Sequence, residues 1–434
     1  MSRLKLVEAA EAVSGIRSGE RVFLGSAAAD PVTLVAALIG RASELRDVSV
    51  IHSLTFGAAP YVEPRYARSF RHTAFFIGAN VRQAVCDGRA DFVPIFLSEI
   101  PALFTRRLPI DWAFVQLSPP DRHGYCSVGV SAETVVGAIR AARHVVAEIN
   151  PRMPRTLGDT MVHVDDLSCA VAIDHELPEL VPPPPTEVGT AIGRLVSPLI
   201  ADGDCLQIGI GAIPNAVLQE LRNHRRLGVH TELLVDGVVD LVECGAIDGS
   251  RKNYNPGKII ATVIAGRKRL YDFVDDNLAV ECHGCDVTND PFLIARNDNM
   301  VSVNSALQID LTGQVDADSF GTELYSGIGG QVDYMRGAAR SRNGRPILTL
   351  PSTAEHDTIS RIVPTLPQGA GVVTSRGDVH FVVTEYGVAD LYAKGVHERA
   401  RALIGLAHPK FRDELEREAR ELGLIGPAHF VSAG

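Results

Sequence analysis

Apolar residues in this chain gather in short runs, which alternate with small-residue turns and with stretches of helical spacing. The run Val22–Gly25 is followed by small residues, a proline and an apolar stretch typical of a helix. Other strand-like runs lie at 144–149, 258–265 and 346–350. Because strands that alternate with helices usually build parallel sheets, this pattern predicts an α/β fold with mostly parallel strands.

The segment 205–237 repeats this pattern and adds chemistry to it. A short apolar strand is predicted to end at the glycine turn Gly209–Gly211, and a helix to begin near Pro214, since proline suits a first helical turn. A second apolar segment leads to Glu232. Backbone N–H groups of such a turn and helix N-terminus favour negative charge. We therefore expect Glu232 to lie within reach of an anion held by the glycines.

Three interpretations of this turn stay open from the residues alone. A dinucleotide site needs G-x-G-x-x-G/A after a strand and an acidic residue about 20 positions later. Glu232 has nearly that spacing, but Pro214 stands where the third glycine or alanine belongs. The turn is a nucleotide site, a site for another anion or an oxyanion, or a plain turn with an acidic residue that caps a nearby helix.

A second glycine-rich loop, 325–330, contains three glycines within four positions. Glycine is favoured where the backbone approaches a ligand closely or takes a positive φ. Gln331 follows directly, and Arg336 and Arg340 come within the next ten residues. The basic residues indicate an anionic ligand nearby, while the alternative is a simple connector.

The sequence C-H-G-C at Cys282–Cys285 does not predict a metal or redox site. No second C-x-x-C accompanies it, so half of a zinc site is missing. A redox pair normally begins a helix, whereas the residues that follow Cys285 are typical of a loop. The odd count of seven cysteines in a long chain favours reduced thiols.

A run of four prolines, Pro182–Pro185, favours extended geometry and suits a linker. We therefore expect an N-terminal α/β domain over 1–181 and a C-terminal α/β domain over 186–434.

The two halves look like distant copies of each other. V-I-H-S-L around His52 corresponds to V-H-T-E-L around His230. The second copy carries a carboxylate, Glu232, at the position where the first copy has Leu54. Functionally, the two copies differ in this one respect.

Composition limits the classes of partner. The chain has 434 residues, of which 46% are apolar and 22% charged, as in ordinary globular proteins. Its net charge of −10 argues against nucleic-acid binding, although a local basic patch can hold a small anion. There is no apolar run of about 20 residues and no signal-peptide pattern, so we expect a cytoplasmic protein without a membrane partner.

Six segments together resemble the acetyl-CoA hydrolase/CoA-transferase family of class I CoA-transferases, most closely 4-hydroxybutyrate and butyrate:acetate CoA-transferases. The resemblance spans nearly the whole chain, and its segments are S-P-P-D-R-H-G-Y-C-S-V-G, M-P-R-T-L-G-D, Q-I-G-I-G-A-I-P-N-A-V, H-T-E-L-L-V-D-G-V-V-D-L, G-I-G-G-Q-V-D-Y-M-R-G-A and V-V-T-E-Y-G-V-A-D-L.

The resemblance implies two similar open α/β domains with the active site at their interface, the N-terminal one contributing to the acid pocket. It implies a catalytic carboxylate at Glu232 and oxyanion support from Gly211 or Gln331. It also implies coenzyme A as a co-substrate, no tightly bound cofactor or metal, and a homodimer or homotetramer. The residues implied in CoA binding are Gly209, Ile210, Gly211, Ala212, Ile213, Gly329, Gly330 and Arg345, the last where lysine is frequent.

The implied reaction moves CoA between an acyl-CoA and a short-chain carboxylate by a ping-pong mechanism, through a glutamyl-CoA thioester on Glu232. An acyl-CoA hydrolase would use the same glutamate. The more distant alternatives are an NAD-dependent oxidoreductase, which would use the interrupted fingerprint, and a non-catalytic CoA-binding protein.

Overall fold

The computed structural model describes residues 4–426 and divides the chain into two compact units. Unit 1 comprises the residues up to Val181 together with Val229–Val239 and Gly257–Asp290. Unit 2 comprises Pro182–Gly228, Asp240–Pro256 and the residues from Pro291 onward.

The first segment of unit 1 ends directly before the proline run, where we expected a boundary. A single boundary at that point does not separate the two units, however, because the chain returns to unit 1 twice. Glu232 lies in one of these returning segments, so it belongs to unit 1 and not with the rest of 186–434.

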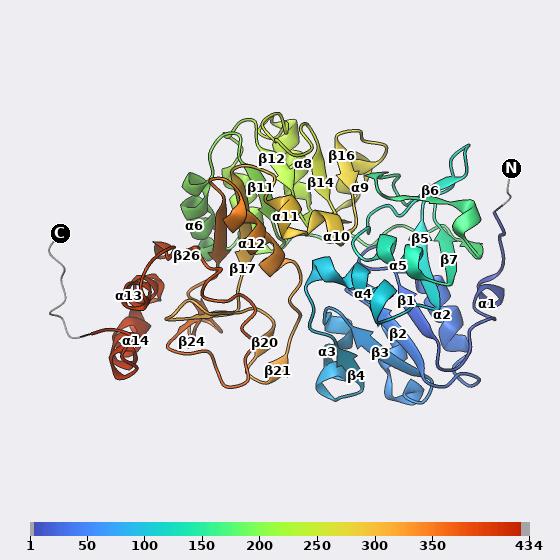
Figure 1. Ribbon diagram of the computed structural model, residues 1–434, viewed down its shortest axis with the longest axis horizontal. Coiled ribbons are helices and arrows are strands. Elements are labelled where there is room, and N and C mark those ends of the chain that lie inside the picture. Colours follow the sequence, from blue (N-terminus) through green and yellow to red (C-terminus); the bar gives the residue numbers. More distant parts are fainter. Residues whose placement is uncertain (1–3, 427–434) are drawn as a thin grey trace. The chain divides into compact units, whose positions relative to one another are not determined.

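The central sheet of unit 1 has the strand order β10-β7-β5-β1-β2-β3-β4, with every pair parallel (Figure 1). Helices cover it, and for this reason its strands are apolar runs; all six residues of β5 are buried. The strands are β1 (Arg21–Leu24), β2 (Val48–His52), β3 (Phe70–Ala74), β4 (Ala90–Phe92), β5 (Trp112–Leu117), β7 (His144–Ile149) and β10 (Cys169–Ala172). The helices of this part are α1 (Ala9–Ala12), α2 (Val32–Gly40), α3 (Ala79–Cys86), α4 (Ile100–Arg106) and α5 (Val135–Ala141).

Unit 1 contains a second group of parallel strands, in the order β12-β14-β16-β8, in which the returning segments supply all but β8. The short strands β13 and β15 pair in parallel beside them, and β6 pairs with β9. The bounds are β6 (Tyr125–Ser127), β8 (Leu157–Gly158), β9 (Met161–His163), β12 (Gly228–His230), β13 (Leu233–Leu234), β14 (Ile259–Ala261), β15 (Val263–Ile264), β16 (Val280–Cys282), α8 (Asp236–Glu243), α9 (Lys268–Val274) and α10 (Cys285–Thr288).

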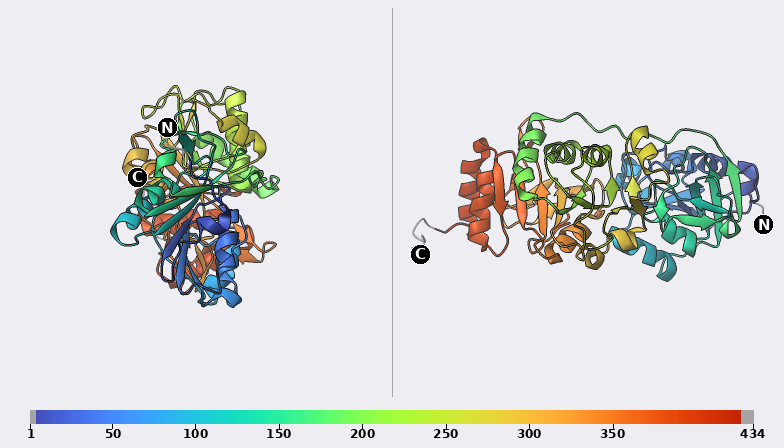
Figure 2. Two further views of the ribbon diagram at one scale, coloured as in Figure 1. Left: turned by 90° about the vertical axis from the view of Figure 1, so that its right-hand side faces the viewer. Right: turned by 90° about the horizontal axis from the view of Figure 1, so that it is seen from above.

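Unit 2 contains parallel strands in the order β11-β17-β22-β26, with β27 added antiparallel to β26. Its main elements are α6 (Glu187–Val196), β11 (Cys205–Ile208), α7 (Ala212–Glu220), α11 (Pro291–Ile294), β17 (Met300–Ser305), α12 (Gln331–Arg340), β22 (Arg345–Thr349), β26 (Phe381–Thr384), β27 (Gly387–Asp390), α13 (Val396–Leu406) and α14 (Pro409–Glu421). Its short strands are β18 (Gln308–Asp310), β19 (Val315–Asp316), β20 (Ser319–Phe320), β21 (Glu323–Leu324), β23 (Thr353–Ala354), β24 (Ile359–Ser360) and β25 (Ile362–Val363). Figure 2 shows α13 and α14 side by side at one end of this unit.

The expected α/β class with mostly parallel strands is confirmed. The predicted runs at 144–149 and 346–350 correspond to β7 and β22, and 258–265 contains β14 and β15. The expected loop after Cys285 is wrong, because α10 begins at this residue. Two contacts hold that short helix: the Cys285 N–H donates to the Glu133 carbonyl (2.8 Å), and its thiol to the Leu97 carbonyl (3.0 Å). The seven cysteines all lie within residues 4–426, and none of them is joined in a disulfide.

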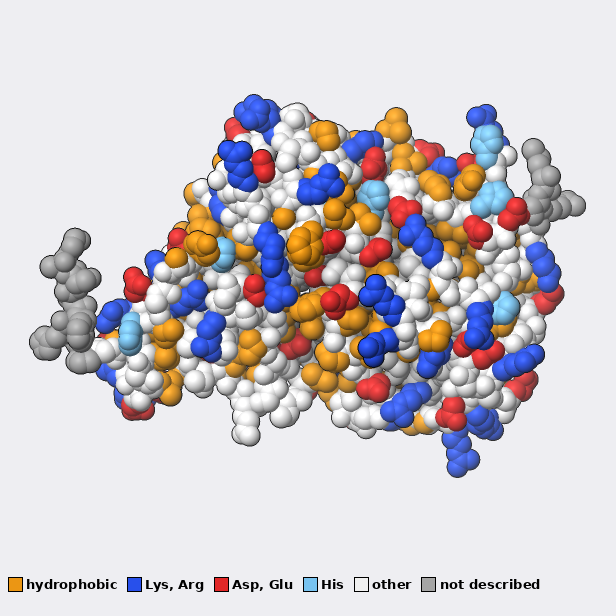
Figure 3. Space-filling model, in the orientation of Figure 1, with side chains coloured by type: hydrophobic (Ala, Val, Ile, Leu, Met, Phe, Trp, Pro, Cys, Tyr) orange, Lys and Arg blue, Asp and Glu red, His pale blue; other side chains and the backbone are white. Residues whose placement is uncertain are grey.

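Two further features concern the distribution of charge on the surface and the length of the apolar helices. On the face drawn in Figure 3, basic and acidic side chains are interspersed. Within residues 4–426, no helix combines the length and the apolar composition needed to cross a bilayer.

Candidate active site

Glu232 lies in unit 1 between β12 and β13. Both strands have parallel partners, β14 and β15, so the backbone is fixed on either side of Glu232. Its own carbonyl accepts hydrogen bonds from the N–H groups of Thr262 (3.1 Å) and Val263 (2.9 Å). The residue as a whole is half-buried.

A buried amide orients this carboxylate. Asn289 Nδ2 donates to Glu232 Oε2 at 2.8 Å, and the Asn289 side chain is fully buried. Asn289 directly follows α10, and its N–H donates to the Cys285 carbonyl (2.9 Å). A hydrogen bond to an ionised carboxylate is stronger than one between neutral groups, so Asn289 fixes the direction in which Glu232 presents its oxygens.

A second carboxyl group, Glu133, lies near Glu232 in the same unit. Its side chain is 3% exposed, and Ser131 Oγ donates to both carboxyl oxygens, at 2.8 and 3.1 Å. The pKa of Glu133 is raised to about 7, chiefly by burial; the hydroxyls of Ser131 and Ser26 act in the opposite direction, and the charge of Glu232 contributes a smaller rise. Sequence reasoning missed both Glu133 and Asn289.

The glycine turn of unit 2 has an open backbone. Gly211 has φ 116° and ψ −177°, a conformation that L-residues rarely adopt. A Cβ at Gly209 would meet nothing within 4 Å, and one at Gly211 only the Cδ of Pro214 at 3.9 Å. Ile210 is 49% exposed, while Ala212 and Ile213 begin α7.

The N-terminus of α7 carries no side-chain cap, since Gly211 occupies the N-cap position. The first N–H groups of a helix have no partner within the helix. Together with the helix dipole, they make an uncapped and accessible N-terminus a binding position for an anion. The helix predicted near Pro214 is confirmed, and it begins two residues earlier.

The second glycine loop lies at the same sheet edge as this turn. Gly329 has φ +56°, and Gly330 is the N-cap of α12. Gln331 Nε2 donates to the carbonyl of Ser305, the last residue of β17 (2.6 Å). Because β11 and β17 are parallel, the loop and the glycine turn both lie at their carboxyl edge, where open α/β sheets bind ligands. The Gln331 amide oxygen accepts from Thr374 Oγ1 at 2.8 Å.

The structure does not bring Arg345 to the glycine turn. Arg345 begins β22 and aligns with Val301, so it lies at the amino edge of the same strands. Its Nη2 pairs with Asp204 Oδ2 at 2.7 Å, and its Nη1 donates to the Leu199 carbonyl at 2.9 Å. Asp204 is almost completely buried, so the guanidinium serves an internal ion pair.

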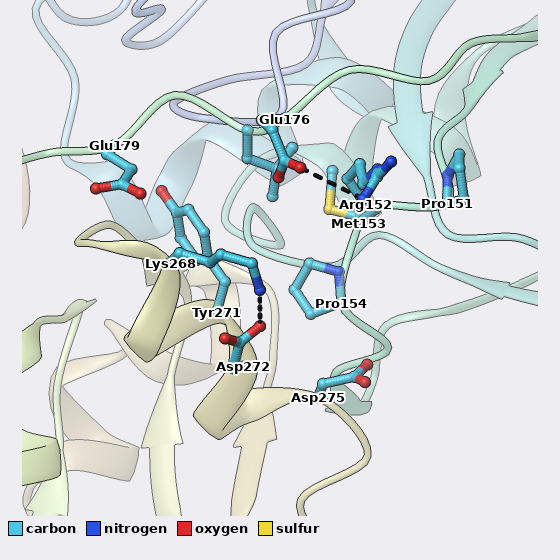
Figure 4. Close-up of a pocket in the computed structure, with 11 residues that line it drawn as sticks. Pro151, Arg152, Met153, Pro154, Glu176, Glu179, Lys268, Tyr271, Asp272 and Asp275 are labelled. Atoms are coloured by element: carbon cyan, nitrogen blue, oxygen red, sulfur yellow. Dashed lines mark hydrogen bonds and ion pairs between the residues drawn. The ribbon is translucent and has the colours of Figure 1, made fainter.

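Unit 1 also contains a cavity of about 330 Å³ (Figure 4). The loop 151–154, the extended segment 176–179 and helix α9 line it. Its basic groups are paired, Arg152 with Glu176 and Lys268 with Asp272. None of the predicted site residues lines this cavity. Among residues 4–426, no group of three or more His, Cys, Asp or Glu is placed to hold a metal ion.

Comparison with known families gives two matches that together cover most of the chain. Residues 3–182 match the acetyl-CoA hydrolase/transferase N-terminal domain, and residues 266–419 match the C-terminal domain of the same family.

Two curated relatives are similar over nearly the full length. The chain is 48% identical to a 4-hydroxybutyrate coenzyme A transferase of Clostridium kluyveri, over 96% of this chain and 97% of the relative. It is 44% identical to a succinyl-CoA:acetate/propanoyl-CoA:succinate CoA transferase of Fasciola hepatica, over 93% and 85% of the two chains.

Two solved structures also superpose closely on this chain. RipA from Yersinia pestis superposes with a TM-score of 0.92 at 35% identity, over 97% of this chain and 98% of that one. A 4-hydroxybutyrate CoA-transferase from Porphyromonas gingivalis superposes with a TM-score of 0.84 at 38% identity, over 96% and 98%.

Proposed function

The chain belongs to the acetyl-CoA hydrolase/transferase family, as its sequence resemblance predicted, and its full-length relatives are CoA-transferases; from this premise we propose that it transfers CoA between an acyl-CoA and a short-chain carboxylate by a ping-pong mechanism. The supporting observation is the carboxylate of the half-buried residue Glu232, held in one orientation by the buried amide of Asn289.

Glu232 is the nucleophile of the proposed reaction. A carboxylate oxygen attacks the thioester carbonyl, the C–S bond breaks, and CoA leaves as a thiolate, which gives an acyl-glutamyl anhydride. The thiolate attacks the glutamyl carbonyl, and the first acid leaves as a carboxylate. The resulting glutamyl-CoA thioester then runs the same steps backwards with a second carboxylate. Covalent catalysis of this kind replaces one difficult step by easier ones, and here no net proton transfer is needed.

Residues of unit 2 supply the proposed CoA contacts. The uncapped N-terminus of α7 and the exposed backbone of Gly209–Gly211 suit a negatively charged group of the ligand. Gly329 and Gly330 provide a second close approach, at the same sheet edge. N–H groups near Gly211 are the proposed oxyanion donors, and losing one such donor typically costs about 10²–10³ in rate. Arg345 has no part in the proposal, because it is engaged with Asp204.

A mass-spectrometric trap tests the role of Glu232. The protein is exposed to an acyl-CoA and treated with borohydride, which reduces a glutamyl thioester, and the modified peptide is identified. We expect modification at Glu232 in the wild type and none in Glu232→Gln, with a loss of transfer of at least about 10³-fold. Glu148→Gln, which alters a buried carboxyl of unit 1, is the matched control and retains labelling. Equal labelling of wild type and Glu232→Gln would contradict the mechanism.

The competing outcome is hydrolysis, in which water takes the place of the second acid. Release of free CoA is therefore measured with and without acetate, propionate, butyrate, 4-hydroxybutyrate or succinate. A transferase forms the new acyl-CoA only when the acid is present, whereas a hydrolase releases CoA equally without it. We also propose that the protein is cytoplasmic and that it forms a homodimer or homotetramer. Sedimentation of the purified protein tests the oligomeric state.

A further inference from the structure

The contacts of Glu133 tie it to the same backbone as Glu232. The N–H of Ala132 donates to the Thr262 carbonyl (2.9 Å), and Ser131 bridges to Val263. The N–H groups of Thr262 and Val263 in turn donate to the carbonyl of Glu232. The backbone segments that carry the two glutamates, about 100 positions apart in sequence, are thus both bonded to one short stretch, 262–263.

Glu133 lacks the partners that usually stabilise a buried anion. Among the described residues it forms no ion pair, and the groups that counteract the effect of burial are neutral donors, chiefly the hydroxyls of Ser131 and Ser26. An unpaired carboxylate in such a place is costly, and burial therefore favours the protonated form of Glu133. The sequence around it, S-A-E-T, gives no indication of this environment.

Glu232 is the charged neighbour that acts on Glu133. Residues 130–133 are bonded to residues 262–264 and to Cys285. The ionisable side chains on these segments and on the segments bonded to them in turn include His230, Glu232, His283, Cys285 and Asp286. Of these, Glu232 raises the pKa of Glu133 by charge repulsion, in addition to the larger effect of burial. Asp286 is exposed, and the Cys285 thiol donates to the Leu97 carbonyl.

We propose that Glu133 is a positioning residue that holds a proton in the neighbourhood of Glu232, so that the anionic acceptor acid meets no negative charge from this pair when it approaches the glutamyl thioester, in which Glu232 itself is uncharged. This inference rests on the proposed function. In the second half-reaction a carboxylate must approach the thioester on Glu232, and a second anion at Glu133 would repel it. The first half-reaction has no such requirement, because the carbonyl that Glu232 attacks is uncharged. Ionisation of Glu133 therefore weakens the use of the acceptor and not of the acyl-CoA.

Kinetics of the two half-reactions test this prediction. In a ping-pong mechanism, kcat/KM for acetate and kcat/KM for the acyl-CoA each report their own half-reaction. Between pH 6 and pH 8.5 we expect kcat/KM for acetate to fall about tenfold or more in the wild type and less than about twofold in Glu133→Gln. The value for acyl-CoA should change equally in both proteins. Glu148→Gln removes another buried carboxyl of unit 1 and should keep the wild-type profile.

A second measurement does not need an active or stable Glu133 variant. Infrared difference spectra follow the protonated carboxyl group of Glu133 as the pH is raised, in the wild type and in Glu232→Gln. Because coupling between two sites is reciprocal, removing the charge of Glu232 should shift the Glu133 titration to lower pH. An unchanged titration overturns the inference.

The outcomes separate the two proposals. If the wild type transfers CoA but Glu133→Gln shows the same steep acetate profile, this inference fails and the proposed function stands. If the wild type forms no new acyl-CoA with any acid, the proposed function fails, and the inference fails with it.

Discussion

The strand–turn–helix segments β1–α2 of unit 1 and β11–α7 of unit 2 have similar sequences. They differ in whether a side chain occupies the N-terminus of the helix. In the first copy, the N-terminus of α2 is already occupied: the Leu34 N–H donates to Glu148 Oε1 at 2.7 Å, and Glu148 comes from the buried strand β7. In the second copy, the N-terminus of α7 has a glycine N-cap and no side-chain partner at that cap.

The two turns differ in the same way. A Cβ on Gly25 would approach the Ala29 carbonyl oxygen to 3.1 Å, and the nearby Asp30 is buried. Gly209 and Gly211 face open space instead. One copy thus uses its turn and helix dipole to build the core, while the other leaves both accessible. We therefore attribute the proposed anion binding at the second turn to the absence of an internal carboxylate there, and not to the strand–turn–helix pattern itself.

Substitution of Gly211 should have the largest effect on this difference. Gly211→Ala places a Cβ on a backbone with φ 116°, at a cost of about 1–3 kcal/mol, and the turn is expected to shift and misalign the N–H groups of α7. We expect KM for the acyl-CoA to rise about 10–100-fold, measured by initial rates.

Gly209→Ala separates strain from ligand contact. It introduces no contact within 4 Å, so its effect on stability should stay within about 0.5 kcal/mol. A raised KM for the acyl-CoA in this variant would therefore indicate interference with ligand binding and not backbone strain. If neither substitution changes KM, the open turn does not bind CoA.

Introducing a carboxylate into the turn of the second copy should raise KM for the acyl-CoA by a smaller factor. Ile210→Asp puts a carboxylate in the turn before α7, comparable to Glu148 at α2. Stability should be unchanged or slightly higher, since negative charge at a helix N-terminus contributes about 0.3–1 kcal/mol. KM for acyl-CoA should rise about tenfold at low salt, and less when salt screens the charge. Ile210→Asn is the neutral control of equal size, and equal KM values for the two variants would argue against an anion at this position.

The smallest expected effect concerns the stability of the first copy. Burial raises the pKa of Glu148 from 4.5 to about 7. A group whose pKa is higher in the folded state stabilises fully below its unfolded pKa, and this contribution is lost as the pH rises through the folded pKa. From pH 5 to pH 8, wild type should therefore lose about 1–3 kcal/mol that Glu148→Gln, which cannot ionise, does not lose. Urea unfolding at both pH values measures this, with the exposed Glu8→Gln as the control. Parallel losses in wild type and Glu148→Gln would contradict it.

Local pattern was sufficient for the elements of the second copy. The apolar run before Gly209, the helix near Pro214 and the strand that leads to Glu232 were all predicted from short-range features, and each is present. Periodicity and turn chemistry depend on neighbours within a few residues, so they can be read directly from sequence.

Position along a strand was harder to obtain from sequence. Arg345 follows the second glycine loop by only 15 residues, yet α12 lies between them and carries the chain back to the opposite edge of the sheet. A charge near a binding loop in sequence is therefore not near it in space when one helix intervenes.

The sequence by itself determined the α/β class, the glycine turn and the position of Glu232 after a strand, because backbone preferences and apolar burial act locally. Only the tertiary structure decided which groups surround that carboxylate. Asn289 is 57 positions away and Glu133 is 99, and both reach the neighbourhood of Glu232 through the pairing of segments that carry no matching signal in the sequence. Whether a helix end is capped or left open was likewise decided by a distant side chain, since the hydrogen bond that fills it comes from another strand of the sheet.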